Sequence, residues 1–195
     1  MNISYCFPSA IFNTVDENLA DQLLPIAKKY LNDENYINKD IKIYKTTWFA
    51  EPKTYEEFNF FSNYVSNIGK MFLKKQGYKT DNINFDVSFF LNEMHYNQYH
   101  PVHTHANNDL SGIIYLQTPP GSGPIIFHDP KPRRYFIQRE IEFPNDSNLN
   151  TISITPMKGM LLMWESWLEH SVEKTENEDL ARISLAFNLS SKIKM

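Results

Sequence analysis

From about residue 83 the chain changes its hydrophobic period, and this change constrains the fold more than any other feature. Seven short runs rich in β-branched and aromatic residues follow, separated by Gly, Pro, Asn and Asp: INFDVSFFLNEM, LSGIIYLQ, GPIIFHD, RYFIQREIEF, NTISITP, GMLLMWE and ARISLAFNLS. Short runs of this kind at roughly even spacing are typical of an all-β sandwich or barrel. The sequence therefore predicts an antiparallel jelly roll over residues 81–195.

The first 80 residues instead predict a helical supporting layer. One helix begins with Thr14 and Glu17 at the spacing of a capping box, and Pro25 inside it predicts a kink or an early break. A second helix begins near Thr54 and Glu57, which have the same spacing. Apolar residues share one face of each helix: Leu19, Leu23, Ala27, Tyr30 and Leu31 in the first, and Phe58, Phe61, Val65, Ile68 and Phe72 in the second. Because the helices precede the strands instead of alternating with them, we expect one domain, residues 1–195, with both helices packed on one sheet.

Composition narrows the classes of function. The 195 residues carry a net charge of −4, so bulk attraction to nucleic acid or to an anionic membrane is not expected. No segment approaches the roughly 18 apolar residues of a membrane-spanning helix. The single cysteine, Cys6, permits no internal disulfide, and the N-terminal residues do not resemble a signal peptide. We therefore expect a cytoplasmic protein.

Three of the six histidines lie within six residues, in HPVHTH. On an extended strand, the side chains of His103 and His105 point to the same face, so both can reach one metal ion. His100 is separated from them by an odd number of residues and is expected to face the other way, as a bystander. An isolated pair of this kind also occurs as solvated loop histidines, so the motif alone does not decide between the two interpretations.

Two further segments carry polar residues that suit a binding site. His170 follows the run GMLLMWE, at a point where a strand leaves the core and can reach the mouth of a barrel. In the last run, Arg182, Ser184 and Asn188 alternate with the apolar residues Ile183, Leu185, Phe187 and Leu189. The polar face is either solvated, as in many sandwiches, or it points into the barrel, where the guanidinium of Arg182 matches a carboxylate.

Taken together, these residues resemble the Fe(II)- and 2-oxoglutarate-dependent oxygenase superfamily, and most closely a family of 2-oxoglutarate-Fe(II) oxygenases found in marine bacteria and phages. The matching text is HTHANNDLSGIIYL, IIFHDP, GMLLMWESWLEH and RISLAFN, over about residues 90–190. The resemblance implies a double-stranded β-helix, a jelly-roll variant, over residues 81–195, with the N-terminal helices as its support. The sequence also resembles the prolyl hydroxylases, more distantly.

The resemblance implies a role for each of six residues. His103, His105 and His170 would be the metal ligands and catalytic centre, and His105 stands where the wider superfamily has a carboxylate. Arg182, assisted by Ser184, would bind the distal carboxylate of 2-oxoglutarate. Tyr115 would lie against the same carboxylate, or be an ordinary core tyrosine.

The implied cofactors are Fe(II), 2-oxoglutarate as cosubstrate, and O2, and the implied reaction is hydroxylation of a small-molecule or peptide substrate with release of succinate and CO2. Two alternatives stay open. A three-histidine site also suits a zinc-dependent hydrolase or hydratase, because zinc activates bound water. The chain could also be a non-catalytic jelly-roll binding module whose histidines are incidental. The sequence gives no indication of the oligomeric state.

Overall fold

The structure, a computed structural model, describes residues 8–47, 56–131, 140–145 and 148–193. Six strands form one antiparallel sheet in the order β1-β8-β5-β10-β3-β2. In chain order these strands are β1 (Ile11–Val15), β2 (Lys45–Thr46), β3 (Ile83–Met94), β5 (Leu110–Gln117), β8 (Met160–Glu165) and β10 (Arg182–Ile193). The two longest strands, β3 and β10, pair side by side along their whole length.

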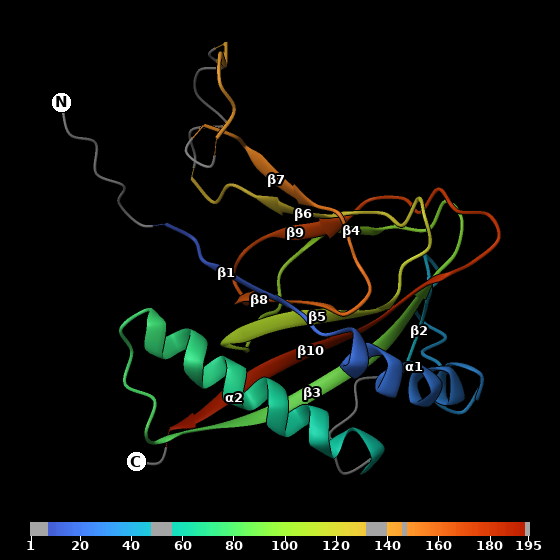
Figure 1. The fold of residues 1–195 in the computed structure, drawn as a ribbon, viewed down its shortest axis with the longest axis horizontal. Helices are drawn as coiled ribbons and strands as arrows, with labels where there is room; N and C mark the ends of the chain where they lie inside the picture. The colour runs from blue at the N-terminus through green and yellow to red at the C-terminus, as the bar shows by residue number, and fades with distance from the viewer. Residues whose placement is uncertain (1–7, 48–55, 132–139, 146–147, 194–195) are drawn as a thin grey trace.

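A second antiparallel sheet has four strands in the order β4-β9-β6-β7. They are β4 (His100–His103), β6 (Ile125–His128), β7 (Thr151–Ile154) and β9 (His170–Val172). This sheet faces the larger one, whose outer surface is covered by the helices α1 (Glu17–Leu31) and α2 (Asn59–Lys75), the latter preceded by the short 3-10 helix η1 (Glu56–Phe58) (Figure 1). The predicted fold, a double-stranded β-helix with N-terminal helices on one sheet, is confirmed.

Strand β10 shows how the larger sheet separates two cores. Its apolar residues, Ile183, Leu185, Phe187 and Leu189, are buried against the helical layer. Successive side chains on a strand point to opposite faces, so Arg182, Ser184 and Asn188 point toward the smaller sheet. All three are at most 2% exposed. The polar face of the last strand is therefore buried between the sheets, not solvated.

The helical layer packs through the residues that the sequence predicts. Every member of the two predicted apolar faces is buried, and all belong to one hydrophobic cluster with the outer face of the larger sheet. Fully burying a side chain of this size contributes about 1.5–3 kcal/mol. Gly69 lets α2 approach β10 closely, since a Cβ at this position would lie 2.7 Å from Cδ1 of Leu189.

The predicted helix caps were wrong where the structure tests them. Thr14 lies in β1, and the N-cap of α1 is Asp16, whose side chain accepts a hydrogen bond of 2.9 Å from the Leu19 N–H. The capping box failed because pairing with β8 holds Thr14 in an extended strand. Thr54 lies outside the described residues. The Glu57 carboxylate accepts hydrogen bonds from the side chains of Lys29 and Tyr30 in α1.

Of the two outcomes predicted at Pro25, the early break does not occur, because α1 continues through this residue to Leu31, and the kink stays a prediction. Proline removes one backbone hydrogen bond from a helix interior and crowds the preceding turn. The apolar face on either side, which includes the fully buried Leu23 and Ala27, remains packed on the sheet. Tertiary packing therefore outweighs the local preference of the proline.

Six of the seven predicted β runs contain a strand, namely β3, β5, β6, β7, β8 and β10. The seventh, residues 134–143, lies largely outside the described residues, and its described part, 140–143, forms no strand. Four strands were not predicted, because β1, β2, β4 and β9 are at most five residues long and lack a clear apolar alternation. Two of them, β1 and β2, lie in the first 80 residues and extend the larger sheet.

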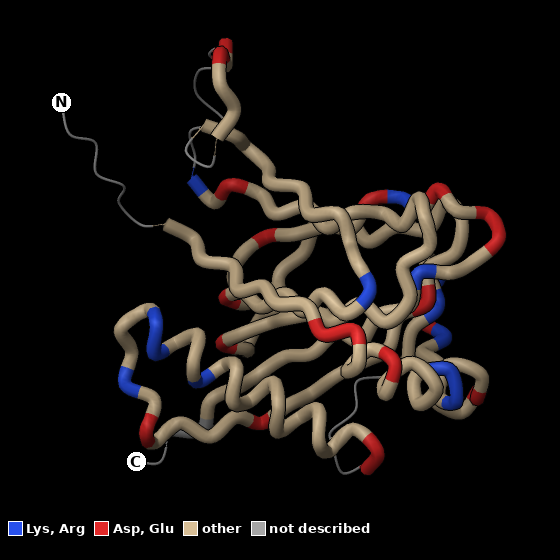
Figure 2. Tube along the Cα trace, in the orientation of Figure 1, with Lys and Arg blue, Asp and Glu red and all other residues tan. Residues whose placement is uncertain are grey.

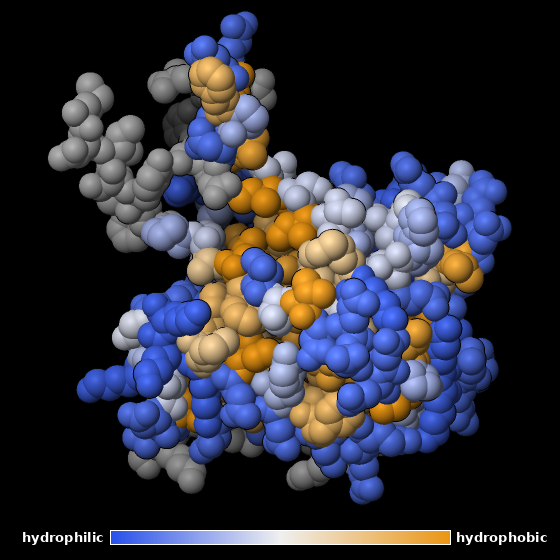
Figure 3. Space-filling model, viewed as in Figure 1, coloured by the Kyte–Doolittle hydropathy of each residue, from blue (hydrophilic) through white to orange (hydrophobic). Residues whose placement is uncertain are grey.

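The surface carries charges of both signs. On the face shown in Figure 2, Lys and Arg lie among Asp and Glu along the helices and loops. Figure 3 shows hydrophilic residues over most of the helical layer and apolar residues gathered between the two sheets. In the part of the chain that the structure describes, no helix has the length and apolar character that a membrane crossing requires.

The observed cap of α1 leads to a stability prediction. Replacing Asp16 by Ala removes the acceptor for the Leu19 N–H and should lower the free energy of unfolding by about 1 kcal/mol. Thr14→Ala is the matched control and should have less than half this effect. Urea unfolding followed by circular dichroism measures both; equal losses would mean that Asp16 does not act as the cap.

Candidate metal centre

Two of the three predicted metal ligands are brought together by the smaller sheet. His103 ends β4 and His170 begins β9, and the two residues are direct partners in this antiparallel pair. Their ring centroids are 4.2 Å apart. His170 is 3% exposed, and the ring of Trp164 packs edge-on against it at 4.7 Å. The backbone ladder thus fixes both imidazoles at the same end of the strand pair.

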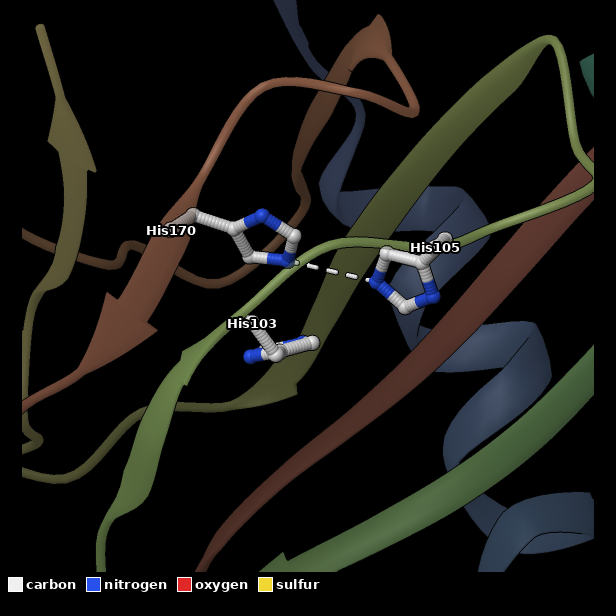
Figure 4. Close-up of side chains that lie close together, drawn as sticks. All are labelled: His103, His105 and His170. Atoms are coloured by element: carbon white, nitrogen blue, oxygen red, sulfur yellow. Dashed lines mark hydrogen bonds between the residues drawn. The ribbon is translucent and has the colours of Figure 1, made fainter. Parts of the chain in front are cut away.

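His105 reaches the same place from beyond the end of β4. Its backbone N–H donates to the Ser166 carbonyl oxygen at 3.0 Å, and its Nε2 lies 3.2 Å from Nε2 of His170 (Figure 4). One ring nitrogen from each of His103, His105 and His170 lies within 4.8 Å of the others. The geometry therefore gathers the three residues into a cluster that could hold one metal ion.

Backbone carbonyls select the ring nitrogen that each of two histidines offers. Nδ1 of His103 lies 2.8 Å from the Pro101 oxygen, and Nδ1 of His170 lies 2.9 Å from the Leu168 oxygen. If each Nδ1 carries the proton and donates it to its carbonyl, Nε2 keeps a free lone pair. Metal-binding histidines are commonly oriented in this way.

Burial lowers the pKa of all three imidazoles. The pKa of His105 falls to about 4 and that of His170 to about 3, in each case through burial first and then through the neighbouring His103. Burial also lowers the pKa of His103, although the backbone carbonyls of Pro101 and His170 oppose this shift. All three rings are therefore neutral at pH 7, which is the form that binds metal ions.

His100 does not face away from His103 as the sequence predicts, although it is not part of the three-histidine cluster. The centroid of its ring lies 3.8 Å from that of His103 and 5.1 Å from that of Tyr44. Strict alternation fails here because the β4–β9 register shifts between His100 and His103. Burial lowers the pKa of His100 to about 4, with smaller contributions from His103 and Arg182 in the same direction.

Arg182 lies at the start of β10 and is 1% exposed. Its Nη1 donates to Sδ of Met94 at 3.0 Å, while Nε and Nη2 have no hydrogen-bond partner among the described residues. A buried cation with unsatisfied N–H groups is expensive unless an anion joins it. The environment of this guanidinium therefore favours the binding of an anionic ligand.

Further buried polar atoms without a partner lie beside Arg182. The hydroxyls of Ser184 and Tyr115 have no hydrogen-bond partner among the described residues, and both side chains are fully buried. The two residues are direct partners in the β5–β10 pair, and the Arg182 guanidinium lies 4.8 Å from the centre of the Tyr115 ring. Two hydroxyls and a guanidinium form a donor set that suits a carboxylate.

Asn92 was missed in the sequence. It is 5% exposed, stands opposite Ser184 in the β3–β10 pair, and its Oδ1 has no partner among the described residues. Asn92, Ser184 and Tyr115 therefore form one row across three strands. The available signal was its position in the apolar run FFLNEM, where it has the parity of Phe90 and Met94 on the inner face.

Comparison with known protein families gives a match over the part of the chain that carries these residues. The sequence profile of the family described as "Putative 2OG-Fe(II) oxygenase" matches residues 88–188, just over half of the chain. The matched range runs from β3 to β10 and includes all six predicted site residues. Among curated proteins, none matches the chain.

Solved structures share the fold. A Pseudomonas putida prolyl-4-hydroxylase superposes with a TM-score of 0.62 at 13% identity, covering 93% of this chain and 92% of the other. The non-heme alpha ketoglutarate dependent epimerase SnoN from nogalamycin biosynthesis gives 0.63 at 10% identity, covering 93% and 78%. A 2OG-Fe(II) oxygenase family oxidoreductase from Burkholderia pseudomallei gives 0.43 at 15% identity, which is too low to indicate a shared fold; the match covers 55% of this chain, and this chain spans 46% of the length of that protein.

The profile match covers the strands that carry the three-histidine cluster and the buried arginine, on a fold that solved oxygenases share. The chain therefore belongs to the 2OG-Fe(II) oxygenase family.

Proposed function

We propose that this protein is an Fe(II)- and 2-oxoglutarate-dependent dioxygenase that hydroxylates a small-molecule or peptide substrate. The reaction balances as substrate C–H plus 2-oxoglutarate plus O2, giving the alcohol, succinate and CO2. Family membership supports the oxygenase over a zinc hydrolase and over a non-catalytic binding module. The observation that carries the proposal is Arg182, a buried guanidinium whose Nε and Nη2 have no hydrogen-bond partner among the described residues. Its charge acts on His100, whose ring packs on His103 of the three-histidine cluster.

His103, His105 and His170 would hold Fe(II) through neutral imidazole nitrogens. Bound iron supplies the oxidising chemistry, together with O2 and 2-oxoglutarate. Three neutral ligands leave the ion with one more unit of positive charge than a set that includes a carboxylate. The pKa values lowered by burial keep protons from competing for these nitrogens near neutral pH.

Arg182, Ser184 and Tyr115 would bind the distal carboxylate of 2-oxoglutarate. A guanidinium donates two parallel hydrogen bonds to a carboxylate, and the two hydroxyls can donate to the same oxygens. A cation–π contact of 4.8 Å also holds the Tyr115 ring beside the Arg182 guanidinium. These residues orient the cosubstrate, and they satisfy their own buried donors when it binds.

Aromatic side chains close the inner side of the metal centre. Trp164 packs on His170, and Phe127 lies 5.1 Å from Trp164 and 6.0 Å from His170, measured between ring centroids. Both are at most 3% exposed. Such a wall keeps water away from the reacting atoms.

The fold does not fix the substrate, because one similar structure is described as a prolyl-4-hydroxylase and another as an epimerase. We favour a peptide or an amino acid, with hydroxylation as the reaction. Demethylation follows from the same chemistry when the new hydroxyl lies on an N-methyl carbon.

Anaerobic titration tests the cosubstrate site. Metal-free protein given Fe(II) and then 2-oxoglutarate should develop a weak visible charge-transfer band that requires both components. Arg182→Ala should raise the 2-oxoglutarate concentration for half-maximal absorbance by at least about 100-fold, since it removes charge-assisted hydrogen bonds. For Arg182→Lys, this concentration should lie between those of the native protein and Arg182→Ala, because lysine keeps the positive charge and loses the planar guanidinium.

The exposed His95 provides the control for the metal ligands. His103→Ala and His170→Ala should abolish the band, whereas His95→Ala should leave it unchanged. Absence of a band in the native protein, with zinc bound stoichiometrically instead, would contradict the proposal and favour zinc chemistry.

The neutral buried histidines also predict a pH dependence. With a folded pKa of about 3 for His170 and about 4 for His105, the metal-free folded protein binds fewer protons than the unfolded chain, whose histidines titrate near 6.5. The free energy of unfolding should therefore fall as the pH is lowered from about 6.5 to 4, by up to about 1.4 kcal/mol per pH unit for each proton taken up.

Urea unfolding of metal-free protein at several pH values measures this slope. His170→Phe replaces the imidazole by an apolar ring among aromatic neighbours. It should therefore lower the slope of the free energy of unfolding against pH by the amount that corresponds to about one proton taken up on unfolding. An unchanged slope in this variant would show that His170 is not held neutral in the folded protein.

A further inference from the structure

We propose that Asn188, Ser111 and Ser166 are positioning residues that hold His105 at the metal centre. This inference rests on the proposed function, because it assigns His105 as a metal ligand. Asn188 shares the inner face of β10 with Arg182 and Ser184, yet the cosubstrate pocket does not use it.

The three side chains form a continuous hydrogen-bonded chain between the sheets. The Ser111 hydroxyl donates to Oδ1 of Asn188 at 2.8 Å and lies 2.7 Å from the Ser166 hydroxyl. Because Ser111 has a single hydroxyl proton, the Ser166 hydroxyl must donate to Ser111. Each of the three residues is at most 2% exposed, so none of these bonds is replaced by water without cost.

This hydrogen-bonded chain ends at Ser166, whose backbone holds the loop that carries His105. The backbone carbonyl of Ser166 accepts from the His105 N–H, and the backbone N–H of Ser166 donates to the Asp109 carbonyl, both at 3.0 Å. Ser166 thus ties the first and last residues of the loop 105–109 to one point. Through Ser111 and Asn188, that point is anchored on β5 and β10 of the larger sheet.

The other two candidate ligands are held differently. His103 and His170 face each other in the β4–β9 ladder, and their rings are oriented by the Pro101 and Leu168 carbonyls. His105 lies past the end of β4 and gains nothing from that ladder. Loss of the hydrogen-bonded chain of side chains should therefore displace His105 while leaving the other two imidazoles in place.

A merely structural network would give a different result. In that case, deleting a hydroxyl would lower stability without changing the affinity for metal. Ser62 provides the matched control, since it is also a buried serine and donates to the Phe58 carbonyl within the helical layer. Ser62→Ala removes the same group far from the histidine cluster.

Anaerobic titration of metal-free protein with Co(II), followed by visible absorption, tests the proposal without catalysis. Ser111→Ala should weaken Co(II) binding roughly 10- to 100-fold, the range typical for residues that orient metal ligands. Ser62→Ala should bind Co(II) like the native protein. Thermal unfolding of each variant without metal shows whether the fold is retained.

A double-mutant cycle with His105→Ala identifies the residue through which the network acts. If Ser111 acts through His105, then Ser111→Ala should cause no further loss of Co(II) affinity in the His105→Ala background. An equal loss in both backgrounds, or native affinity in Ser111→Ala, overturns the inference. If Ser111→Ala does not fold, Ser166→Ala provides the same test, since it keeps the backbone bonds to His105 and Asp109 and removes only the hydroxyl.

The same data separate this inference from the proposed function. Native protein that binds no Co(II), or binds it unchanged in His105→Ala, contradicts the assignment of His105 as a ligand. Native protein that loses affinity in His105→Ala but not in Ser111→Ala or Ser166→Ala contradicts the positioning role alone.

Discussion

A guanidinium buried between two sheets, with no anionic partner among the described residues, is the constraint on which the candidate site depends. Arg182 can occupy this place because β10 lies between β5 and β3 in the larger sheet and the helices cover its opposite face. The smaller sheet supplies the facing half of the site, with His103 and His170 on one strand pair. The proposed site is thus divided between the sheets: the residues proposed to bind the anion lie on one, and the candidate metal ligands lie at the end of a strand pair of the other or just beyond it.

The sequence predicted those parts of the fold that depend on local periodicity. The long strands β3, β5 and β10 and the buried faces of α1 and α2 follow from apolar residues repeated at two or at three to four positions. The alternation in β10 also placed Arg182 and Ser184 on one face. Periodicity alone could not tell whether this face was solvated, and the matching motifs of a known family supplied the remaining argument.

The features that the sequence missed depend on contacts between distant segments. The strand β4 is defined by its pairing with β9, and a register shift within this pair turns His100 onto His103 against simple alternation. Likewise, β8 holds Thr14 in a strand, so Asp16 caps α1. Asn92 reads as an ordinary polar residue until the neighbouring strands place it in a buried row with Ser184 and Tyr115.

The central claim is that the buried guanidinium recognises the distal carboxylate of the cosubstrate. Its most direct test is calorimetric titration of Mn(II)-loaded native protein with 2-oxoglutarate and with 2-oxobutanoate, which keeps the keto acid end and lacks the distal carboxylate. The account predicts that 2-oxoglutarate binds at least about 100-fold more tightly, because only this ligand satisfies Arg182, Ser184 and Tyr115. Equal affinities for the two acids would contradict it.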